Sequence, residues 1–457
     1  MMLISELVRN ILETSFERFD QSIVDKARNR IIDVIGCLIA GANAPGCAAL
    51  KDLAKEWGGK KESTILVHGG KVPAYNAAMV NSMMARSYDF EPVGPYVDGK
   101  DTPGHISGTT VPTALAVAEQ KASSGKDLLT ALILGDDLAS RLNAASNFSL
   151  DSGWDCTGTT NMFGASAIAG RLLGLDERQM LNAFGIVVNQ LAGTMQNVFD
   201  GVHSFKLPQS LAARAGIFSA ALASKGFTGV KDPLCSKYGY FSLYCKSYQL
   251  DILTKDLGKR FYADNTFKPY PCCRSNHGAI DCALELACSN KIEPEDIEEV
   301  NVDISPAGYD FAVGQPFKIG EVSQVDAAFS LQYNVANALV RKCVRLEHFT
   351  EDLVKDPKIL DVIKKIRLTA TIPPEKFLGA GVKVKMRQGG EYEKRVDVPK
   401  GDDTIAPLTQ DEKIEKFMNN VAFSKTVPLE KAEQALNLLK RLEEVDHISK
   451  IIKLLVA

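Results

Sequence analysis

The amino-acid sequence predicts a mainly α-helical protein with a smaller α+β lid, and three observations predict this class. Up to about residue 265, apolar residues recur at helical spacing. Between residues 268 and 400, several segments alternate between apolar and polar residues, as half-buried strands do. The helical spacing then returns. We therefore expect an all-helical domain formed by residues 1–267 and 401–457, and an α+β lid domain over residues 268–400.

The expected helices of the larger domain are rich in small residues. Residues 161–173 are almost wholly Ala, Gly and large apolar residues, so we expect a helix buried on all sides. Gly174 is suited to end that helix, and Asp176 to cap the next one. Such helices pack backbone close to backbone, as an interior layer requires. The expected helices are residues 22–42, 126–142, 161–173, 177–193 and 210–225.

The lid is expected to combine a small sheet with helices. Residues 297–304 and 366–371 alternate as half-buried strands. Residues 382–386 and 392–398, with a Gly-Gly pair between them, are typical of a β-hairpin. The helical patterns interleaved with these strands are residues 277–287, 324–339 and 357–365.

Length and composition restrict the class of protein. A chain of 457 residues is too long for one ordinary core. Its 45% hydrophobic and 24% charged residues are those of a soluble globular protein. The net charge of −3 argues against nucleic acid or a membrane surface as partner. The first residues lack the apolar core of a secretory signal, and no run reaches the roughly 18 apolar residues of a membrane span. We expect a cytoplasmic protein.

The ten cysteines do not predict a metal site. They are scattered and form no CxxC pair, whereas zinc and iron–sulfur sites favour short ligand spacings. Scattered cysteines of a cytosolic chain are mostly small buried hydrophobes. The pair Cys272-Cys273 lies beside basic residues and could be reactive, although packing is the simpler interpretation.

The segment from Tyr88 to His105 is the most informative part of the chain. It places Asp89, Asp101 and His105 around Pro and Gly residues, between two apolar helical segments. Loops held by rigid helices often carry catalytic groups. A histidine near carboxylates is suited to moving protons near neutral pH. A polar helix–helix connection with a capping Asp explains the same residues equally well.

Two further segments present cations. Lys206 lies just before a buried helix, where it could hold a carboxylate or transfer protons; a solvated loop lysine is the plainer interpretation. Lys268, Arg274 and His277 lie within ten residues at an expected helix start, which is suited to binding an anion. An interdomain linker with ordinary surface cations is the alternative for that segment. The two prolines there fit either interpretation.

Two single residues complete the candidates. Asp155 precedes the expected buried helix, where a capping carboxylate is the plain interpretation. Tyr333 falls in an apolar helical pattern, where a core tyrosine is the commoner outcome. Only the whole set of candidates favours a functional role for either residue.

With these segments in hand, the chain resembles the MmgE/PrpD family over nearly its whole length. That family includes methylcitrate dehydratases, cis-aconitate decarboxylases and iminodisuccinate epimerases. No single motif decides the resemblance, but several occur in the family's order. The segments that carry it are residues 30–37, 163–167 with 172–176, 226–229, 268–272 with 277–281, and 326–333.

The resemblance implies an active site between the helical domain and the lid that needs neither metal nor organic cofactor. It implies a homodimer as well. The positions that match the family's site are Asp89, His105, Lys206, Lys268, His277 and Tyr333.

The chain also departs from the family pattern. Asp155 stands where relatives often have His, and Gln209 lies where many have His after the lysine. Residues 91–100 form a long insertion. Because Asp and Gln replace residues that can carry a positive charge, the expected site has fewer cations than the sites of such relatives. This favours a substrate with fewer carboxylates or with another polar group.

The expected activity is that of a cofactor-independent lyase of the dehydratase (hydro-lyase) type. Its substrate would be a small di- or tricarboxylic acid of the methylcitrate or aconitate class. His105, oriented by Asp89 or Asp101, is expected to act as acid or base, with Tyr333 or Lys268 delivering a second proton. Arg274, His277 and one lysine are expected to hold carboxylates. An epimerase, a decarboxylase, a metal-dependent hydrolase and a non-catalytic helical scaffold are the alternatives.

Overall fold

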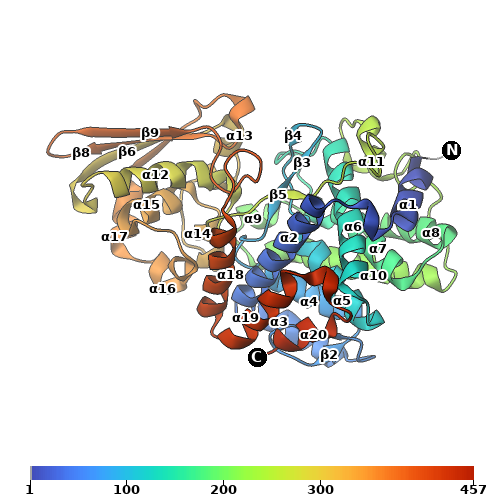
Figure 1. Ribbon diagram of the computed structural model, residues 1–457. Coiled ribbons are helices and arrows are strands. Elements are labelled where there is room, and N and C mark those ends of the chain that lie inside the picture. Colours follow the sequence, from blue (N-terminus) through green and yellow to red (C-terminus); the bar gives the residue numbers. More distant parts are fainter. Residues whose placement is uncertain (1–2) are drawn as a thin grey trace.

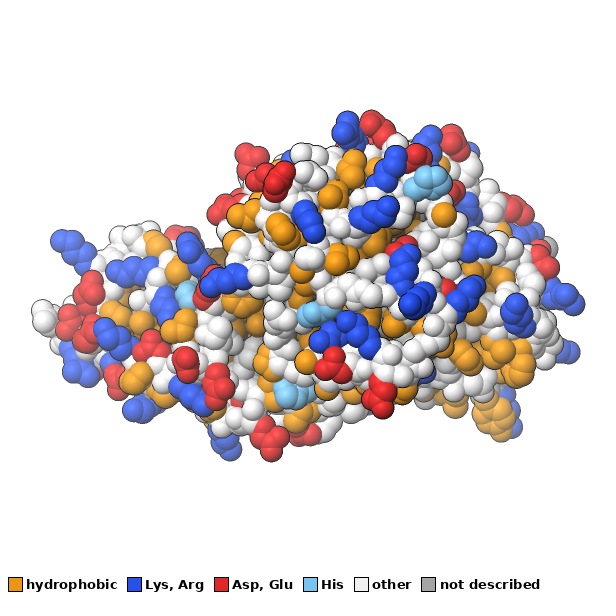
Figure 2. Space-filling view, turned by 90° about the horizontal axis from the view of Figure 1, so that it is seen from below, with side chains coloured by type: hydrophobic (Ala, Val, Ile, Leu, Met, Phe, Trp, Pro, Cys, Tyr) orange, Lys and Arg blue, Asp and Glu red, His pale blue; other side chains and the backbone are white. Residues whose placement is uncertain are grey.

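Helices dominate the computed structural model, which describes residues 3–457: 56% of it is helical and 9% is strand. The fold class expected from the sequence is therefore confirmed. In Figure 1 the four-stranded sheet and its helices form one lobe, and the long helices form the other. Among the described residues, no helix is both long enough and apolar enough to cross a bilayer. Lysine, arginine and acidic side chains are interspersed on the face shown in Figure 2.

The larger lobe consists of helices from both ends of the chain. The C-terminal helix α18 packs against α2, as the sequence analysis expects for a chain that returns to the helical domain. The helices of this lobe are α1 (Leu3–Glu13), α2 (Gln21–Gly41), α3 (Cys47–Trp57), α4 (Ala74–Arg86), α5 (Ser107–Lys121), α6 (Gly125–Ala145), α7 (Thr160–Leu173), α8 (Glu177–Val187), α9 (Gln196–Phe199), α10 (Leu207–Ser224), α11 (Tyr240–Tyr244), α18 (Gln410–Ser424), α19 (Leu429–Leu439) and α20 (Ser449–Leu454).

Small residues allow the central helices to pack closely, as expected. A Cβ atom on Gly164 of α7 would lie 2.8 Å from the carbonyl oxygen of Gly135 in α6, so only glycine fits there. Helix α7 ends at Gly174, whose φ of 77° is left-handed. Asp176 then caps α8 in a capping box with Gln179. Both end signals expected from the sequence are confirmed.

The smaller lobe is built around a four-stranded sheet with the strand order β7-β6-β8-β9. Strands β6 and β7 pair in parallel, while β6–β8 and β8–β9 pair antiparallel, and the last pair is the expected hairpin. Helices α12, α15 and α17 lie along one side of the sheet (Figure 1). The elements are β6 (Ile297–Asp303), β7 (Ile366–Thr369), β8 (Ala380–Met386), β9 (Glu391–Val396), α12 (His277–Ser289), α13 (Pro306–Asp310), α14 (Ser323–Ala328), α15 (Leu331–Arg341), α16 (Glu351–Val354) and α17 (Pro357–Lys364).

Three expectations about individual elements were wrong. The helix expected over residues 177–193 ends at Val187. The helix expected over residues 324–339 is two helices, because Ser330 adopts an extended backbone and its side chain caps α15 by accepting from the Tyr333 amide. The region before residue 265 is not purely helical. Its short strands are β1 (Ser63–Thr64), β2 (Lys71–Val72), β3 (Val93–Val97), β4 (Lys100–Asp101) and β5 (Asp264–Thr266).

The 91–100 insertion pairs with the chain segment that leads into the smaller lobe. Its strand β3 pairs with β4 and, on its other edge, with β5, which directly precedes the start of the smaller lobe. This pairing brings the chain around Asp89 next to the chain around Lys268. Residues far apart in the sequence thereby share one site.

Candidate active site

A cavity of about 880 Å³ lies between the two lobes. Its wall includes residues of both lobes and of the β3–β4 hairpin. Its polar lining residues include Arg86, Asp101, His105, Asp155, Arg274 and Asp402. A space of this size accommodates a small organic acid.

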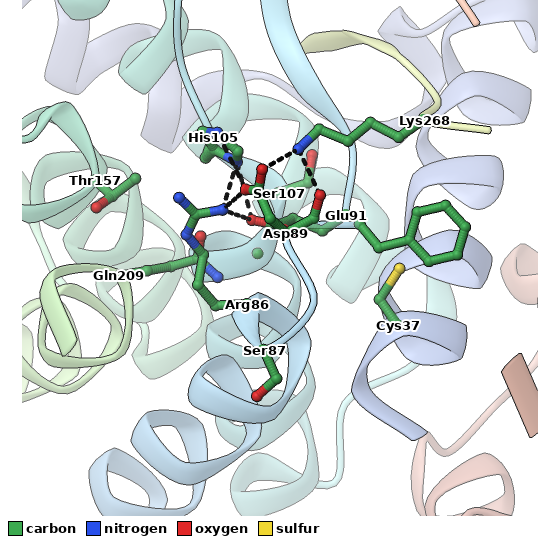
Figure 3. A network of polar contacts seen from close by, with 12 residues as sticks. Cys37, Arg86, Ser87, Asp89, Glu91, His105, Ser107, Thr157, Gln209 and Lys268 are labelled. Atoms are coloured by element: carbon green, nitrogen blue, oxygen red, sulfur yellow. Dashed lines mark hydrogen bonds and ion pairs between the residues drawn. The ribbon is translucent and has the colours of Figure 1, made fainter. Parts of the chain in front are cut away.

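Five charged or ionisable side chains form a network (Figure 3), and two of them, Arg86 and His105, line this cavity. The Arg86 guanidinium pairs with Asp89 and lies 3.1 Å from Glu91 Oε1. Lys268 Nζ lies 3.0 Å from Asp89 Oδ2 and donates to the Asp89 carbonyl oxygen at 2.6 Å. His105 Nδ1 lies 2.9 Å from Glu91 Oε1, and its Nε2 lies 3.8 Å from Asp89 Oδ1. We call these five residues the charged network.

Four of the five members lie at or beside the end of a secondary-structure element, and Asp89 lies in the loop between α4 and β3. Arg86 is the last residue of α4, and Glu91 precedes β3. His105 lies just before α5, and Lys268 follows β5. Asp89 has a φ of 48°, a left-handed conformation that is uncommon for residues other than glycine. Strain of this kind persists where the surrounding structure fixes it, often at functional sites.

The network keeps its carboxylates ionised although they are buried. Burial by itself raises the pKa of Asp89, but Lys268 and Arg86 outweigh it and hold that pKa below its usual value. Burial likewise opposes ionisation of Glu91, and Arg86 and His105 hold the pKa of Glu91 below its usual range. Burial favours a neutral Arg86 side chain, yet the nearby carboxylates leave the pKa of Arg86 raised, so its charge is permanent.

His105 lines the cavity and has the most exposed side chain of the charged network. Its side chain is 21% exposed, whereas those of Arg86, Asp89, Glu91 and Lys268 are 6% exposed or less. Burial, then the charges of Arg86 and Lys268, lower the pKa of His105 below its ordinary value. Its imidazole is therefore neutral at pH 7. Nδ1 faces Glu91 Oε1 at 2.9 Å, which can only accept, and Arg86 Nη1 at 3.2 Å, which can only donate. Because the contact with Glu91 is the shorter one, we assign the proton to Nδ1, which leaves Nε2 with a free lone pair.

The same residues do not fit a metal ion well. Asp89, Glu91 and His105 bring ligand atoms within 4.8 Å of one another. However, Arg86 Nη1 already contacts all three, at 3.2 Å from His105 Nδ1, and Lys268 takes the second oxygen of Asp89. A divalent cation placed there would meet two fixed positive charges. We therefore derive no chemical step through a metal.

Comparison with known proteins identifies the family. Residues 5–253 match the MmgE/PrpD N-terminal domain, and residues 270–444 match the MmgE/PrpD C-terminal domain. The chain belongs to the MmgE/PrpD family. The resemblance stated from the sequence is thereby confirmed.

The curated relatives are distant but match most of the chain. A cis-aconitate decarboxylase of Aspergillus terreus is 24% identical over 408 residues, which cover 83% of this chain and 81% of the relative. A cis-aconitate decarboxylase-like protein, oryM, of Aspergillus oryzae is 23% identical over 477 residues, which cover 99% of this chain and 96% of the relative.

Several other residues expected in this MmgE/PrpD site lie on the cavity wall. Asp155 and Asp101 line it from the helical lobe, and Arg274 lines it from the smaller lobe. Arg274 is buried and donates to the carbonyl oxygens of Lys400 at 2.6 Å and of Pro399 at 2.8 Å. Because those bonds hold its side chain, its charge has a fixed position on the cavity wall.

Asp89 and Lys268 of the charged network do not line the cavity, and three expected site residues outside the network also lie behind its wall. Lys206 is fully buried and donates to the Pro45 carbonyl oxygen at 2.7 Å, and burial lowers its pKa. His277 is fully buried beside Arg274, with 3.2 Å between its Nδ1 and Arg274 Nη1. Tyr333 lies in the core of the smaller lobe and donates to the His348 carbonyl oxygen. None of the three lines the cavity, so direct contact with a substrate stays a prediction for each.

Arg86 and Glu91 are site residues that the sequence reasoning missed. Arg86 ends a helix of small apolar residues, and an arginine there is also a common way to finish a helix. Glu91 lies inside the 91–100 insertion, whose length by itself gives no indication of a site residue. The available signal was the spacing Arg-x-x-Asp-x-Glu, which places one cation within reach of two carboxylates.

Proposed function

We propose that this MmgE/PrpD protein is a cofactor-independent lyase of the dehydratase type. Its substrate is a small di- or tricarboxylic acid of the methylcitrate or aconitate class, and the reaction removes a proton from the carbon next to a carboxylate. One observation carries the proposal: a neutral histidine, His105, meets the cavity while four buried charged groups fix its ring and its tautomer. That is the arrangement that a general base needs.

The proposed step uses only the chain's own groups. His105 Nε2 takes the proton from the carbon, and Arg86 and Arg274 stabilise the negative charge that builds on the adjacent carboxylate. The electron pair of the broken C–H bond forms the C=C bond as the C–OH bond breaks. The imidazolium returns its proton to the departing hydroxide, so water is released and His105 is neutral again.

A decarboxylase is the second candidate, and the names of the two Aspergillus relatives favour it. In that reaction the C–CO₂ bond breaks in place of the C–H bond, CO₂ leaves, and the electron pair left on carbon takes a proton from the protein. Epimerisation would share the same proton abstraction but return the proton to the opposite face. In all three reactions, negative charge builds up on the reacting carbon.

A panel of di- and tricarboxylic acids in deuterated water, followed by NMR, tests the proposal. We expect new vinyl signals with at least one hydroxy acid, which indicates dehydration. Vinyl signals together with released CO₂ would indicate decarboxylation instead of dehydration. Deuterium at the carbon next to the carboxylate without net product would indicate an epimerase. No exchange with any acid would contradict proton abstraction altogether.

We also propose that the protein forms a homodimer through α10 and α3. Phe218 on α10 is 45% exposed, and Trp57 on α3 is 49% exposed. Arg214 of α10 lies over the Trp57 ring at 5.2 Å, so the two helices present one surface. Large exposed aromatic side chains of this kind are typical of interface centres.

We expect Phe218→Glu to convert the dimer to a monomer, because a buried unpaired carboxylate opposes association. Light scattering after size-exclusion chromatography measures the change. Tyr309→Glu, at an exposed aromatic residue of α13 in the smaller lobe, is the control and should leave the mass unchanged. A monomeric wild-type protein, or a dimer that tolerates Phe218→Glu, would contradict this interface.

A further inference from the structure

The loop that carries two carboxylates of the charged network is held from its other side by helix α18. Asp89 and Glu91 contact the rest of the network, whereas Tyr88 and Phe90 contact α18. The Tyr88 ring meets the Phe423 ring edge-on, with 5.6 Å between the ring centres. None of the described residues 410–424 of α18 lines the cavity. The loop therefore joins the site to a helix that lies outside it.

Lys416 is the residue of α18 that brings a charge to this loop. Its side chain is 6% exposed, and its Nζ donates to the Phe90 carbonyl oxygen at 2.8 Å and to Asp33 of α2 at 2.9 Å. The same ammonium group lies 4.0 Å from the centre of the Phe90 ring. Burying an ammonium group is unfavourable unless it is paired and hydrogen-bonded. These contacts therefore hold the lysine in one position.

Two buried lysines thus hold two successive carbonyl oxygens of the loop. Lys268 donates to the carbonyl oxygen of Asp89 at 2.6 Å, and Lys416 donates to that of Phe90. One lysine follows β5 and the other belongs to α18, so different parts of the fold supply them. The left-handed backbone of Asp89, with its φ of 48°, lies between these two contacts. Such a conformation persists where the surroundings fix it, and the two lysines do so here.

The Phe90 carbonyl group limits where Glu91 can lie. It belongs to the same planar peptide unit as the Glu91 nitrogen, so the two move together. Glu91 Oε1 lies 2.9 Å from His105 Nδ1, the contact to which we assign the proton of that nitrogen. A rotation of the peptide unit would draw Glu91 away from the imidazole. Arg86 Nη1, which can only donate, would then be the remaining neighbour of Nδ1 and would favour the proton on Nε2.

We propose that Lys416 is a positioning residue of the site: by holding the Phe90 carbonyl oxygen, it keeps Glu91 against His105 Nδ1 and leaves Nε2 free to act as the base. The inference rests on the proposed function, because it assigns a residue to the base of that reaction. Lys416 itself does not line the cavity. A purely structural role, in which its pair with Asp33 only joins α18 to α2, is the alternative.

Lys416→Met, alone and combined with Asp33→Asn, separates these two roles. The single variant leaves the Asp33 carboxylate buried without its partner, so it should lose stability in urea. The double variant removes that carboxylate charge and should regain much of the stability, but the Phe90 carbonyl oxygen still lacks its donor. We therefore expect both variants to lower kcat about 10–100-fold, as a small misplacement of a catalytic group does, with KM within about twofold of wild type.

NMR of protein labelled with ¹⁵N at histidine gives a second measurement that needs no reacting substrate. It distinguishes protonated from unprotonated ring nitrogens among the six histidines, and His105→Ala identifies the signals of His105. In the wild type we expect the proton on Nδ1. In both Lys416→Met proteins we expect it to shift toward Nε2. Because Glu91 raises the pKa of His105, that pKa should also fall in these variants.

Asn420→Leu is the matched control. Asn420 lies one turn after Lys416 on α18, is 1% exposed and donates to Cys37 of α2, so it joins the same two helices. It should leave kcat and the His105 tautomer as in the wild type. The inference is overturned by a double variant with wild-type kcat or with the His105 proton still on Nδ1, and equally by Asn420→Leu with the same changes. If no acid reacts, the lyase proposal fails, and the tautomer still decides the role of Lys416.

Discussion

Replacing His105 with alanine is expected to lower kcat/KM about 10²–10⁴-fold, the usual contribution of a general base. The side chain is the one in the charged network with substantial access to the cavity, and its Nε2 is free to take a proton. The surrounding charges stay in place in this variant, so the fold should be retained. Steady-state kinetics with the acid that reacts in the deuterium panel measures the effect.

The pH profile separates a catalytic role of His105 from a structural one. Since burial and the charges of Arg86 and Lys268 lower its pKa, the imidazole stays neutral below the usual histidine pKa. We expect kcat/KM to be level at neutral pH and to fall only as the pH drops below about 6.5, the ordinary value. His105→Ala should lose this acid limb. His447→Ala, at an exposed histidine, is the control. Full activity of His105→Ala would contradict the assignment of His105 as the base.

The sequence predicted the outline of the site because its chemistry is concentrated in short segments. Asp89, His105 and Lys268 stood out as a histidine and charged groups in stiff loops, and the structure brings them together across a separation of 179 residues between Lys268 and Asp89. The family resemblance helped to group these residues in one site, because the β3–β5 pairing that brings them together joins segments far apart in the sequence. Lys206 and Tyr333 illustrate the limit. Their residue types fit catalysis, but local sequence does not reveal whether a side chain meets a cavity or the core.

Secondary-structure elements could be predicted from the sequence where interactions between neighbouring residues determine them. Helix α7 and its stop at Gly174 follow from burial and from a left-handed cap, both encoded within a few residues. Strand β3 was missed because it exists through its partner β5, which lies far away in the sequence. The break before α15 was missed because a single extended residue, Ser330, interrupts an otherwise helical pattern. Long-range pairing and single-residue breaks are the parts that hydrophobic periodicity does not register.

Replacing Lys268 with methionine is expected to cost about 3–5 kcal/mol of unfolding free energy at neutral pH, the usual penalty for breaking a buried ion pair. Lys268 is fully buried, and its Nζ contacts both the carbonyl oxygen and the carboxylate of Asp89. Methionine fills a similar volume but leaves Asp89 and Glu91 with Arg86 as their main compensation. Urea denaturation followed by circular dichroism compares the variants. Lys383→Met, which breaks the exposed pair with Glu391, is the control and should cost less than about 1 kcal/mol.

The direction of the pH dependence tests the electrostatic origin of this loss. Lys268 is a main reason why the pKa of Asp89 lies below its usual value, so in Lys268→Met burial raises that pKa. Protonation then neutralises Asp89 as the pH falls, and the stability difference from wild type should shrink toward acid pH. Adding Asp89→Asn to Lys268→Met removes the unpaired charge, so it should recover much of the stability at neutral pH. If the loss of stability in Lys268→Met is independent of pH and unaffected by Asp89→Asn, its cause is the packing around the lysine side chain and not the unpaired charge.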